Sequence, residues 1–486
     1  MSVSTALSNA LSGLDANARR AEVVSDNVAN ALVDGYAGRD VRLATRGVSG
    51  GVEVVGLARR GDPQARSRLR LAEADVAGSD ALAAARERLS AAVGGPDDPG
   101  SLAARATAFE VALSRLVDTP ESAALQADTA AEAAATARAF NAASTEVVAL
   151  RGEADAAIDR LTGEANKALL AVERLNAEIR RAEVQGGVAA RELPALQDDR
   201  DGWIDRLAEI VPIRTARRDF GEIAIYAPGG AVLLEGRAQT FGFSRASALD
   251  PASSVGAGGL SAVTLGGSVI DAGSTGPLAG GELSAQVAVR DEIGPEMQTR
   301  LDAIAADLMQ RFEAPGLDAT RAPGSPGLFT DAGAVYDPAD VVGLSARLAL
   351  SAEVDPAVGG EPRRLRDGLG AAAPGPAGDP TLARALLDTL TADRPAPPGS
   401  GLSRDGGAAG FAGGLSGLAA EAAGRAEADA ALARGRRVGL AEAEAVARGV
   451  DVDAELADLL VVEQAYAANA RVVSVADDLL RTLLEI

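Results

Sequence analysis

The sequence contains no cysteine and no histidine, and Lys167 is its single lysine. Without cysteine there is no disulfide, no thiolate nucleophile and no cysteine-ligated zinc. Without histidine the commonest general base and metal ligand are missing, so neither a Ser-His-Asp nor a Cys-His site can be built. Aromatic residues make up only 3%, which is few for a ligand pocket. We therefore predict no catalytic, cofactor-binding or metal-binding residues, and no cofactor.

Charge and hydropathy exclude two further classes of partner. The formal net charge is −22, which would repel the phosphate backbone of a nucleic acid. No segment reaches the roughly 18 apolar residues of a membrane span, so we expect no membrane insertion. The first twenty residues also lack the basic start and apolar core of a cleaved signal peptide. Composition alone therefore favours a soluble cytoplasmic protein of roughly two to four domains.

Both ends of the chain carry an apolar seam with the spacing of a supercoiling helix. The average spacing is about 3.5 residues, which predicts a long helix near each terminus. The seam of the first helix, expected over residues 3–31, consists of Val3, Leu7, Leu11, Leu14, Ala18, Ala21, Ser25 and Val28. The seam of the second consists of Leu459, Val462, Tyr466, Asn469, Val473, Ala476, Leu480 and Leu483, and Leu456, Leu460 and Leu484 widen it.

Acidic residues precede the second seam and allow two interpretations. Asp451, Asp453 and Glu455 could begin a calcium-binding EF-hand loop, or they could occupy the first turn of a helix, where carboxylates suit the helix dipole. An EF-hand needs glycine at its sixth position and glutamate at its twelfth, and here these are Leu456 and Val462. The pattern therefore favours a helix start.

The seams themselves have two readings. They could form the ordinary core of a helical hairpin that closes a globular domain. Alternatively, the terminal helices pair with each other and then with other copies, because a two-helix hairpin buries little core of its own. On the second reading, the residues that we predict to act in subunit assembly are Leu7, Leu11, Leu14, Asn27, Asn30, Gly35, Tyr36, Leu459, Tyr466, Asn469, Val473, Leu480 and Leu483.

Asparagine is a poor choice for the middle of a helix, yet Asn27, Asn30 and Asn469 lie in these segments. A polar residue in an apolar seam can fix register and partner number at some cost in stability. Alternatively, Asn30 ends the first helix and Asp34-Gly35 forms a turn. Both readings can hold at different positions, and we predict that the three asparagines act in assembly.

Between the ends the pattern changes several times. After the β-like stretch GVEVVGLARR (51–60), the sequence to residue 212 is rich in Ala, Leu, Glu and Arg, with Ser101 as a good helix N-cap. Over 213–279 the period becomes two, and Pro228-Gly229-Gly230 signals a hairpin. Residues 316–399 are rich in Gly, Pro and Ala.

These patterns predict a mainly α chain with a β-rich insertion and nested domains. Residues 1–60 and 440–486 would form an axial coiled-coil domain of terminal helices. Residues 61–212, 280–315 and 400–439 would form a helical-bundle domain. Residues 213–279 would be the outer β-rich insertion, and 316–399 an irregular Gly/Pro-rich region with short helices.

Two terminal motifs resemble the flagellar rod, hook and hook-associated axial proteins. SDNVANALVDGYAGR (25–39) resembles their N-terminal signature, Ser-x-Asn-(Ile/Val)-Ala-Asn followed by Gly and an aromatic residue. EQAYAANARVVSVADDLLRTLLEI (463–486) resembles their C-terminal signature. The chain departs from the pattern at Val33 and Asp34, where a Thr-containing turn is usual, and at Ala37-Gly38 before the arginine.

Three internal segments resemble one branch of that family, hook-associated protein 1, which forms the first hook–filament junction. They are LNAEIRRAEVQGG (175–187), LQDDRDGWIDRLAEIV (196–211) and the stretch 280–312. The resemblance implies a structural protein that is not an enzyme, exported through the flagellar type III apparatus without a cleaved signal peptide. Its place would be extracellular, at the hook–filament junction of the bacterial flagellum.

The same resemblance implies a set of partners. The chain would self-associate in a ring, contact hook protein on one side and the second junction protein on the filament side, and bind an export chaperone through its C-terminal helix. Alternatives are another axial protein (hook or distal rod), which the long helical region disfavours, and a filament-borne surface enzyme, which no motif supports. A cytoplasmic coiled-coil regulator would not need both terminal signatures.

Overall fold

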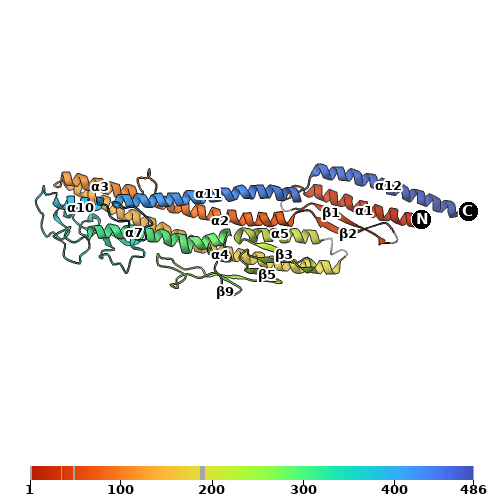
Figure 1. The fold of residues 1–486 in the computed structure, drawn as a ribbon, viewed down its shortest axis with the longest axis horizontal. Helices are drawn as coiled ribbons and strands as arrows, with labels where there is room; N and C mark the ends of the chain where they lie inside the picture. The colour runs from red at the N-terminus through yellow and green to blue at the C-terminus, as the bar shows by residue number, and fades with distance from the viewer. Residues whose placement is uncertain (1–2, 34–35, 48–49, 187–191, 485–486) are drawn as a thin grey trace.

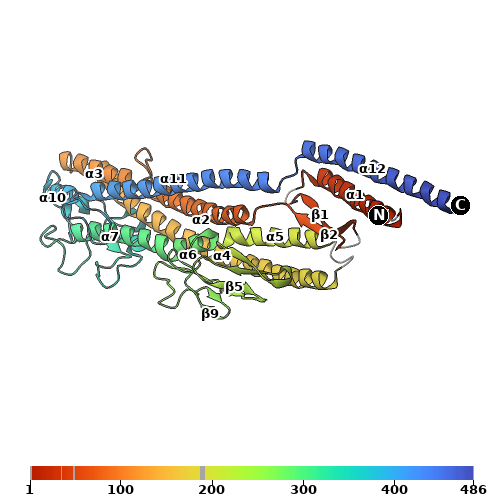
Figure 2. The same ribbon diagram turned by 45° about the vertical axis from the view of Figure 1, so that its right-hand side comes forward.

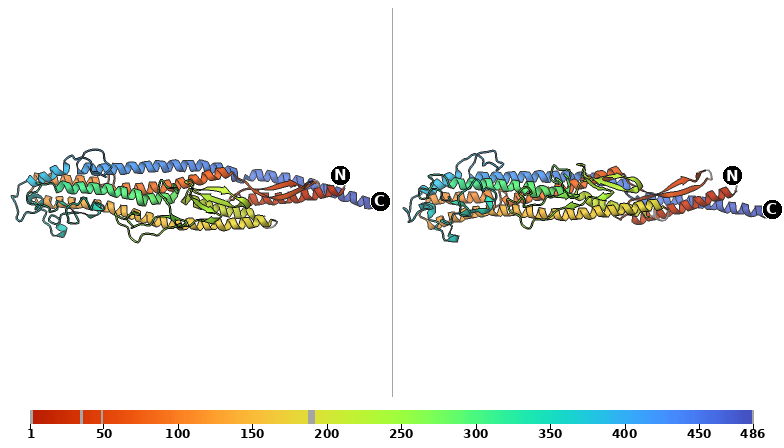
Figure 3. Two further views of the ribbon diagram at one scale, coloured as in Figure 1. Left: turned by 60° about the horizontal axis from the view of Figure 1, so that its bottom comes forward. Right: turned by 90° about the horizontal axis from the view of Figure 1, so that it is seen from below.

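The computed structural model describes residues 3–33, 36–47, 50–186 and 192–484. The molecule is long and thin, and both chain ends lie at one tip (Figure 1). At that tip α1 (Val3–Asn30) runs antiparallel to α12 (Val452–Leu484), as the other views also show (Figures 2 and 3). We call these helices the terminal-helix pair. Together with the hairpin of β1 (Arg39–Thr45) and β2 (Val52–Arg59), they form the terminal-helix domain.

The two terminal helices lie where the sequence predicts them. The first spans Val3–Asn30 against the expected 3–31. The second begins directly after Asp451, whose carboxylate accepts hydrogen bonds from the backbone N–H groups of Asp453 (3.0 Å) and Ala454 (3.1 Å). This is the geometry of a helix N-cap, so the helix-start interpretation is confirmed.

A bundle of longer helices makes up most of the remaining molecule. Its main members are α2 (Pro63–Val93), α3 (Leu102–Asp118), α4 (Ala123–Gln185), α5 (Leu193–Ile210), α7 (Gly294–Phe312) and α11 (Ala408–Arg448). The hydroxyl of Ser101 accepts a hydrogen bond from the N–H of Ala104, 3.2 Å away, which confirms it as the N-cap of α3. The helix α11 runs unbroken through residue 440 and ends at Arg448.

The core of the bundle has two parts. The larger part lies among α3, α4, α7 and α11, and its centre holds the rings of Phe109, Phe312 and Phe329, with centroids 5.5 to 6.2 Å apart. The second part lies where α4 and α5 pack against the β-rich segment. A run of α4 positions, including Ile158, Leu161 and Val172, is buried there.

The β-rich segment comprises two small antiparallel sheets, with orders β3-β4-β5-β6 and β7-β8-β9. Their strands are β3 (Arg214–Arg217), β4 (Ile223–Tyr226), β5 (Val232–Glu235), β6 (Arg237–Ala238), β7 (Phe241–Gly242), β8 (Thr264–Leu265) and β9 (Ser268–Val269). The hairpin predicted at Pro228-Gly229-Gly230 joins β4 to β5, and the N–H of Gly230 donates to the carbonyl of Ala227 (2.9 Å). The chain then returns through α6 (Gly281–Ala288) and a π-helical turn, η4 (Val289–Ile293), into α7.

The Gly/Pro-rich region is more regular than its composition indicates. It contains a two-stranded antiparallel sheet of β10 (Phe329–Asp331) and β11 (Leu348–Leu350), and the helices α8 (Leu344–Arg347), α9 (Arg364–Asp367) and α10 (Thr381–Thr391). The prediction of a mainly helical chain with small β-sheets and terminal helices is confirmed. The nested division into domains stays a prediction.

Candidate assembly surface

Small residues and the ion pair of Arg20 with Asp458 lie in the contact between the two terminal helices. Gly13 on α1 lies against Asn469 on α12, so closely that an added Cβ would lie 2.7 Å from the amide nitrogen of Asn469. The guanidinium of Arg20 donates to the carboxylate of Asp458 at 2.7 Å. Ala10 of α1 and Val462 and Ala476 of α12 are buried. The two helices are therefore in close contact.

The predicted leucine seam of α1 lies beside its buried face. Leu7 and Leu14 are half-buried, and the side chain of Leu11 is 51% exposed. The positions that α1 buries instead are Ala10, Ser12, Ala16, Asn17, Val23, Val24 and Asn27. They form two stripes because α1 contacts both α12 and the β1–β2 hairpin. A role for these leucines in subunit assembly stays a prediction.

Most of the assembly residues predicted on α12 are partly covered. Leu459, Asn469, Val473 and Leu480 are half-buried, whereas Tyr466 is 48% exposed. The side chain of Leu483 lies outside those that the structure describes, and so does the whole of Gly35.

Asn27 connects α1 to the β-hairpin. It is fully buried, and its Oδ1 accepts hydrogen bonds from the phenol of Tyr36 (2.9 Å) and the N–H of Arg39 (3.0 Å). Its Nδ2 donates to the carbonyl of Arg39 at 2.9 Å. The side-chain amide thus pairs with Arg39 as a neighbouring strand would. Burial raises the pKa of Tyr36 despite the nearby guanidinium of Arg39, so the phenol keeps the proton that it donates.

The other two asparagines are placed differently. Asn30 donates from Nδ2 to the carbonyl of Asp26 at 2.8 Å, a contact within its own helix. Asn469 faces Gly13 across the pair. Asn27 therefore has a role in the subunit's own fold, and an assembly role for the three asparagines stays a prediction.

The sequence analysis did not predict a second apolar stripe on α12. Val461, Val472, Val475 and Leu479 are all about half exposed, and their spacings of 11, 3 and 4 residues place them on one helix face. The signal was present in the sequence as a set of apolar positions adjacent to the first seam. Listing the apolar residues on both sides of the predicted seam of α12 would have identified this second stripe.

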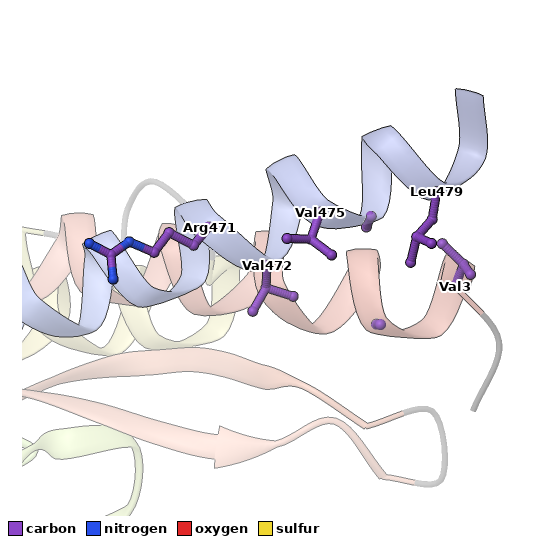
Figure 4. A pocket seen from close by; sticks show the side chains of 7 residues that line it. Val3, Arg471, Val472, Val475 and Leu479 are labelled. Atoms are coloured by element: carbon purple, nitrogen blue, oxygen red, sulfur yellow. The ribbon is translucent and has the colours of Figure 1, made fainter. Parts of the chain in front are cut away.

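Part of this stripe lines an open groove between the two helices (Figure 4). The groove has a volume of about 350 Å³. Its lining is almost wholly apolar and consists of Val3, Ala6, Arg471, Val472, Val475, Ala476 and Leu479.

Within the described part of the chain, no group of three or more acidic side chains is arranged to hold a metal ion. Across the same residues, none of the helices is long and apolar enough to cross a membrane.

Three protein-family models match the chain, one in the middle and one near each end. The model described as the flagellar hook-associated protein FlgK helical domain matches residues 89–328. The flagella basal body rod protein model matches 7–36, and the C-terminal model of the flagellar basal body rod FlgEFG proteins matches 447–486. The two terminal matches fall on α1 and α12.

Among solved structures, the chain is similar to the flagellar hook junction protein FlgK from Burkholderia pseudomallei, at 16% identity and a TM-score of 0.38. The match covers 54% of this chain and 46% of that one, so the chain spans less than half of the solved protein. No curated protein matches the sequence significantly.

Proposed function

Because the chain belongs to the flagellar axial proteins, with the helical domain of hook-associated protein FlgK, we propose that it is a structural component of the hook–filament junction. The observation that carries the proposal is the match of residues 89–328 to that helical domain, flanked by two rod-protein matches. Rod, hook and hook-associated proteins are structural, so we expect no enzymatic activity. The long helical domain distinguishes the chain from a hook or distal rod protein.

The terminal-helix pair is the part that would join subunits. Its helices leave exposed Leu11 of α1 and the second stripe of α12, including Val472 and Val475. Neighbouring copies in a ring would cover these faces. A heterologous contact of this kind, in which two different faces meet, closes into a ring when the rotation permits.

The remaining partners follow from the position of a junction. We propose hook protein on one side of the ring, the second junction protein on the filament side, and an export chaperone that covers the apolar faces of α12 before assembly. The chain would leave the cell through the flagellar export apparatus without signal cleavage and reside outside the cell.

Deleting the gene tests the proposal. We expect electron micrographs of the deletion strain to show hooks of normal length without attached filaments, and flagellin in the medium. A plasmid copy of the gene should restore the filaments. Filaments that remain attached would refute a junction role, and loss of the hooks would assign the chain to the rod or the hook instead.

A further inference from the structure

A row of side chains on α4 attaches one irregular segment of the β-rich insertion to the helical bundle. We call this segment, residues 241–253, the strap; after the two residues of β7 it contains no helix or strand. Arg151, Asp155 and Asn166 of α4 are spaced by 4 and 11 residues, so they lie on one face of that helix. Each of the three forms hydrogen bonds with the backbone of the strap.

The end of the strap is held by Arg151, which is 1% exposed. Its Nη1 donates to the carbonyls of Asp250 (3.2 Å) and Pro251 (3.3 Å), and its Nη2 donates to the carbonyl of Ser253. Its Nε donates to the carbonyl of Arg290 in η4, 2.9 Å away. Arg151 therefore connects α4, the strap and the return helix through backbone carbonyls.

The carbonyl of Arg290 can accept this hydrogen bond because η4 is a π-helical turn. The N–H of Gly294 donates to the carbonyl of Val289, five residues back, instead of to that of Arg290. The next residue, Pro295, has no N–H to donate. Glycine at 294 also makes room, since an added Cβ would lie 2.5 Å from Cγ of Arg151. The π turn thus leaves both an acceptor and the space for Arg151.

Asp155 and Arg290 hold the middle of the strap. They are 0% and 1% exposed, and Nη1 of Arg290 donates to Oδ1 of Asp155 at 2.8 Å. The other carboxylate oxygen accepts the N–H of Ala246 in the strap, also at 2.8 Å. The guanidinium carbon of Arg290 lies 5.3 Å from the centre of the ring of Phe243, a further strap residue. One buried ion pair therefore contacts the strap at two points.

Asn166 holds the first residue of the strap as a neighbouring strand would. Its Nδ2 donates to the carbonyl of Phe241 (2.8 Å), and its Oδ1 accepts the N–H of the same residue (2.7 Å). Asn176, further along α4, pairs in the same way with Ile223 of β4, outside the strap, at 2.8 and 3.2 Å. Asn176 therefore offers a matched control for Asn166.

Partial release of the strap is disfavoured because the side chains that hold its middle and its end are charged and buried. A buried charge that loses its partners without gaining water is strongly destabilising. If residues 250–253 alone moved away, the guanidinium of Arg151 would keep one acceptor, the carbonyl of Arg290. Complete release instead admits water to these groups, and Asp155 still pairs with Arg290 inside the bundle.

We propose that the strap opens and closes on α4 as one unit while the helical bundle stays folded. The row of side chains on α4, rather than strand pairing within the strap, then sets the position of this part of the insertion. The strap is a local unfolding unit of lower stability than the bundle. The inference concerns the chain itself and does not rest on the proposed junction role.

Hydrogen–deuterium exchange of the whole chain, measured by mass spectrometry, tests the proposal. In the unmutated protein, peptides from residues 244–253 should exchange together, and faster than peptides around Arg151 and Asp155 on α4. Arg151→Met should accelerate exchange over 244–253 by about tenfold or more, since one hydrogen bond to a charged donor is worth about that factor. Exchange of α3 should not change. Arg138→Met, at an exposed arginine of α4, is the control and should change neither rate.

Asn166→Ala separates opening as a unit from local fraying. The variant removes a partner of Phe241 alone, yet we expect faster exchange throughout 244–253, whereas Asn176→Ala should leave that segment unchanged. Acceleration confined to residues 241–242 in Asn166→Ala would overturn the proposal. So would exchange over 244–253 that is no faster than exchange of α4 in the unmutated protein.

Gly294→Ala is a second variant in case Arg151→Met is unfolded by circular dichroism. It keeps every hydrogen-bonding group, but its Cβ would displace the side chain of Arg151. We expect the same acceleration over residues 244–253. If either variant is folded and its strap exchanges as slowly as in the unmutated protein, Arg151 does not hold the strap and the proposal is wrong.

Discussion

The phenol of Tyr36 donates a hydrogen bond to Oδ1 of Asn27, 2.9 Å away, and the same amide pairs with both backbone groups of Arg39. The N-terminal signature motif at residues 25–39 therefore attaches β1 to α1 through hydrogen bonds. Its asparagine and its aromatic residue contact each other directly within one subunit.

This arrangement predicts that Asn27→Ala destabilises the hairpin by about 2–3 kcal/mol, because buried groups of Tyr36 and Arg39 lose their partners. Asn30→Ala is the control, since Asn30 makes only one contact within its own helix. Amide exchange of residues 39–45 provides the measurement. Equal exchange rates in the two variants would contradict the role given to Asn27.

The contact of Gly13 with Asn469 predicts an unusual response to Gly→Ala substitution. In a helix interior this change normally stabilises by about 1 kcal/mol. We expect that gain for Gly163→Ala on α4, where an added Cβ meets nothing within 4 Å. At Gly13 the Cβ would press on the amide of Asn469, so Gly13→Ala should yield no gain or a loss.

Pairing the two substitutions separates this contact from other causes. In an Asn469→Ala background, Gly13→Ala should recover the ordinary helix gain in urea unfolding. If Gly13→Ala gives no gain in stability in that background either, the close approach of Asn469 is not the reason why alanine fails to stabilise the helix at residue 13.

Glu73 on α2 predicts a pH dependence of the helical bundle. Burial, with Asp205 and Glu209 nearby, raises its pKa from 4.5 to about 7, although Arg437 and Arg70 oppose the shift. The folded state then binds a proton more tightly than the unfolded one, so this group makes folding less stable as the pH rises from about 4.5 to about 7.

Replacing the carboxyl group of Glu73 should remove this loss of folding stability at higher pH. We expect Glu73→Gln to be more stable than the unmutated protein at pH 8, by about 1 kcal/mol because the site is partly exposed, and the two to converge near pH 4. Asp201→Asn should behave oppositely, since the pKa of Asp201 is lowered to about 2 and its stabilising effect is present at neutral pH. A pH-independent difference for Glu73→Gln would contradict the shifted pKa.

The exposed stripe of α12 predicts variants that fold but do not assemble. Val472→Asp with Val475→Asp should leave the circular dichroism of the secreted subunit unchanged, because both side chains are about half exposed. Incorporation at purified hook tips should be lost, since two charges would be buried without partners. Val438→Asp, at a similarly exposed valine of α11, should incorporate normally. Equal incorporation of both variants would contradict an assembly role for the stripe.

Periodicity predicted the terminal helices well because their signal is local. The extent of α1 and the start of α12 among its acidic residues follow from spacing and composition. Which face of α1 is buried did not follow, because two neighbours compete for that helix. The hairpin strand β1, with the sequence RDVRLAT, carries charges on both faces and gives no clear alternation.

The remaining misses depend on contacts between distant segments. The strands β10 and β11 are only three residues long each, too short to show a period, and the segment between them includes α8. Arginines near residue 60 form ion pairs with carboxylates near residue 200, Arg59 with Asp201 and Arg70 with Asp205. In the sequence these residues look like ordinary solvated charges, and only the tertiary fold makes them a cluster.

The most direct test of the central claim uses a single engineered thiol in a chain that has none of its own. Val475→Cys should react readily with a maleimide in the secreted subunit, because Val475 is 58% exposed. We predict that the same thiol is protected in purified hook–filament junctions, where a neighbouring copy would cover α12. Equal reactivity in the free subunit and the assembled junction would contradict the claim that the terminal-helix pair is the assembly surface.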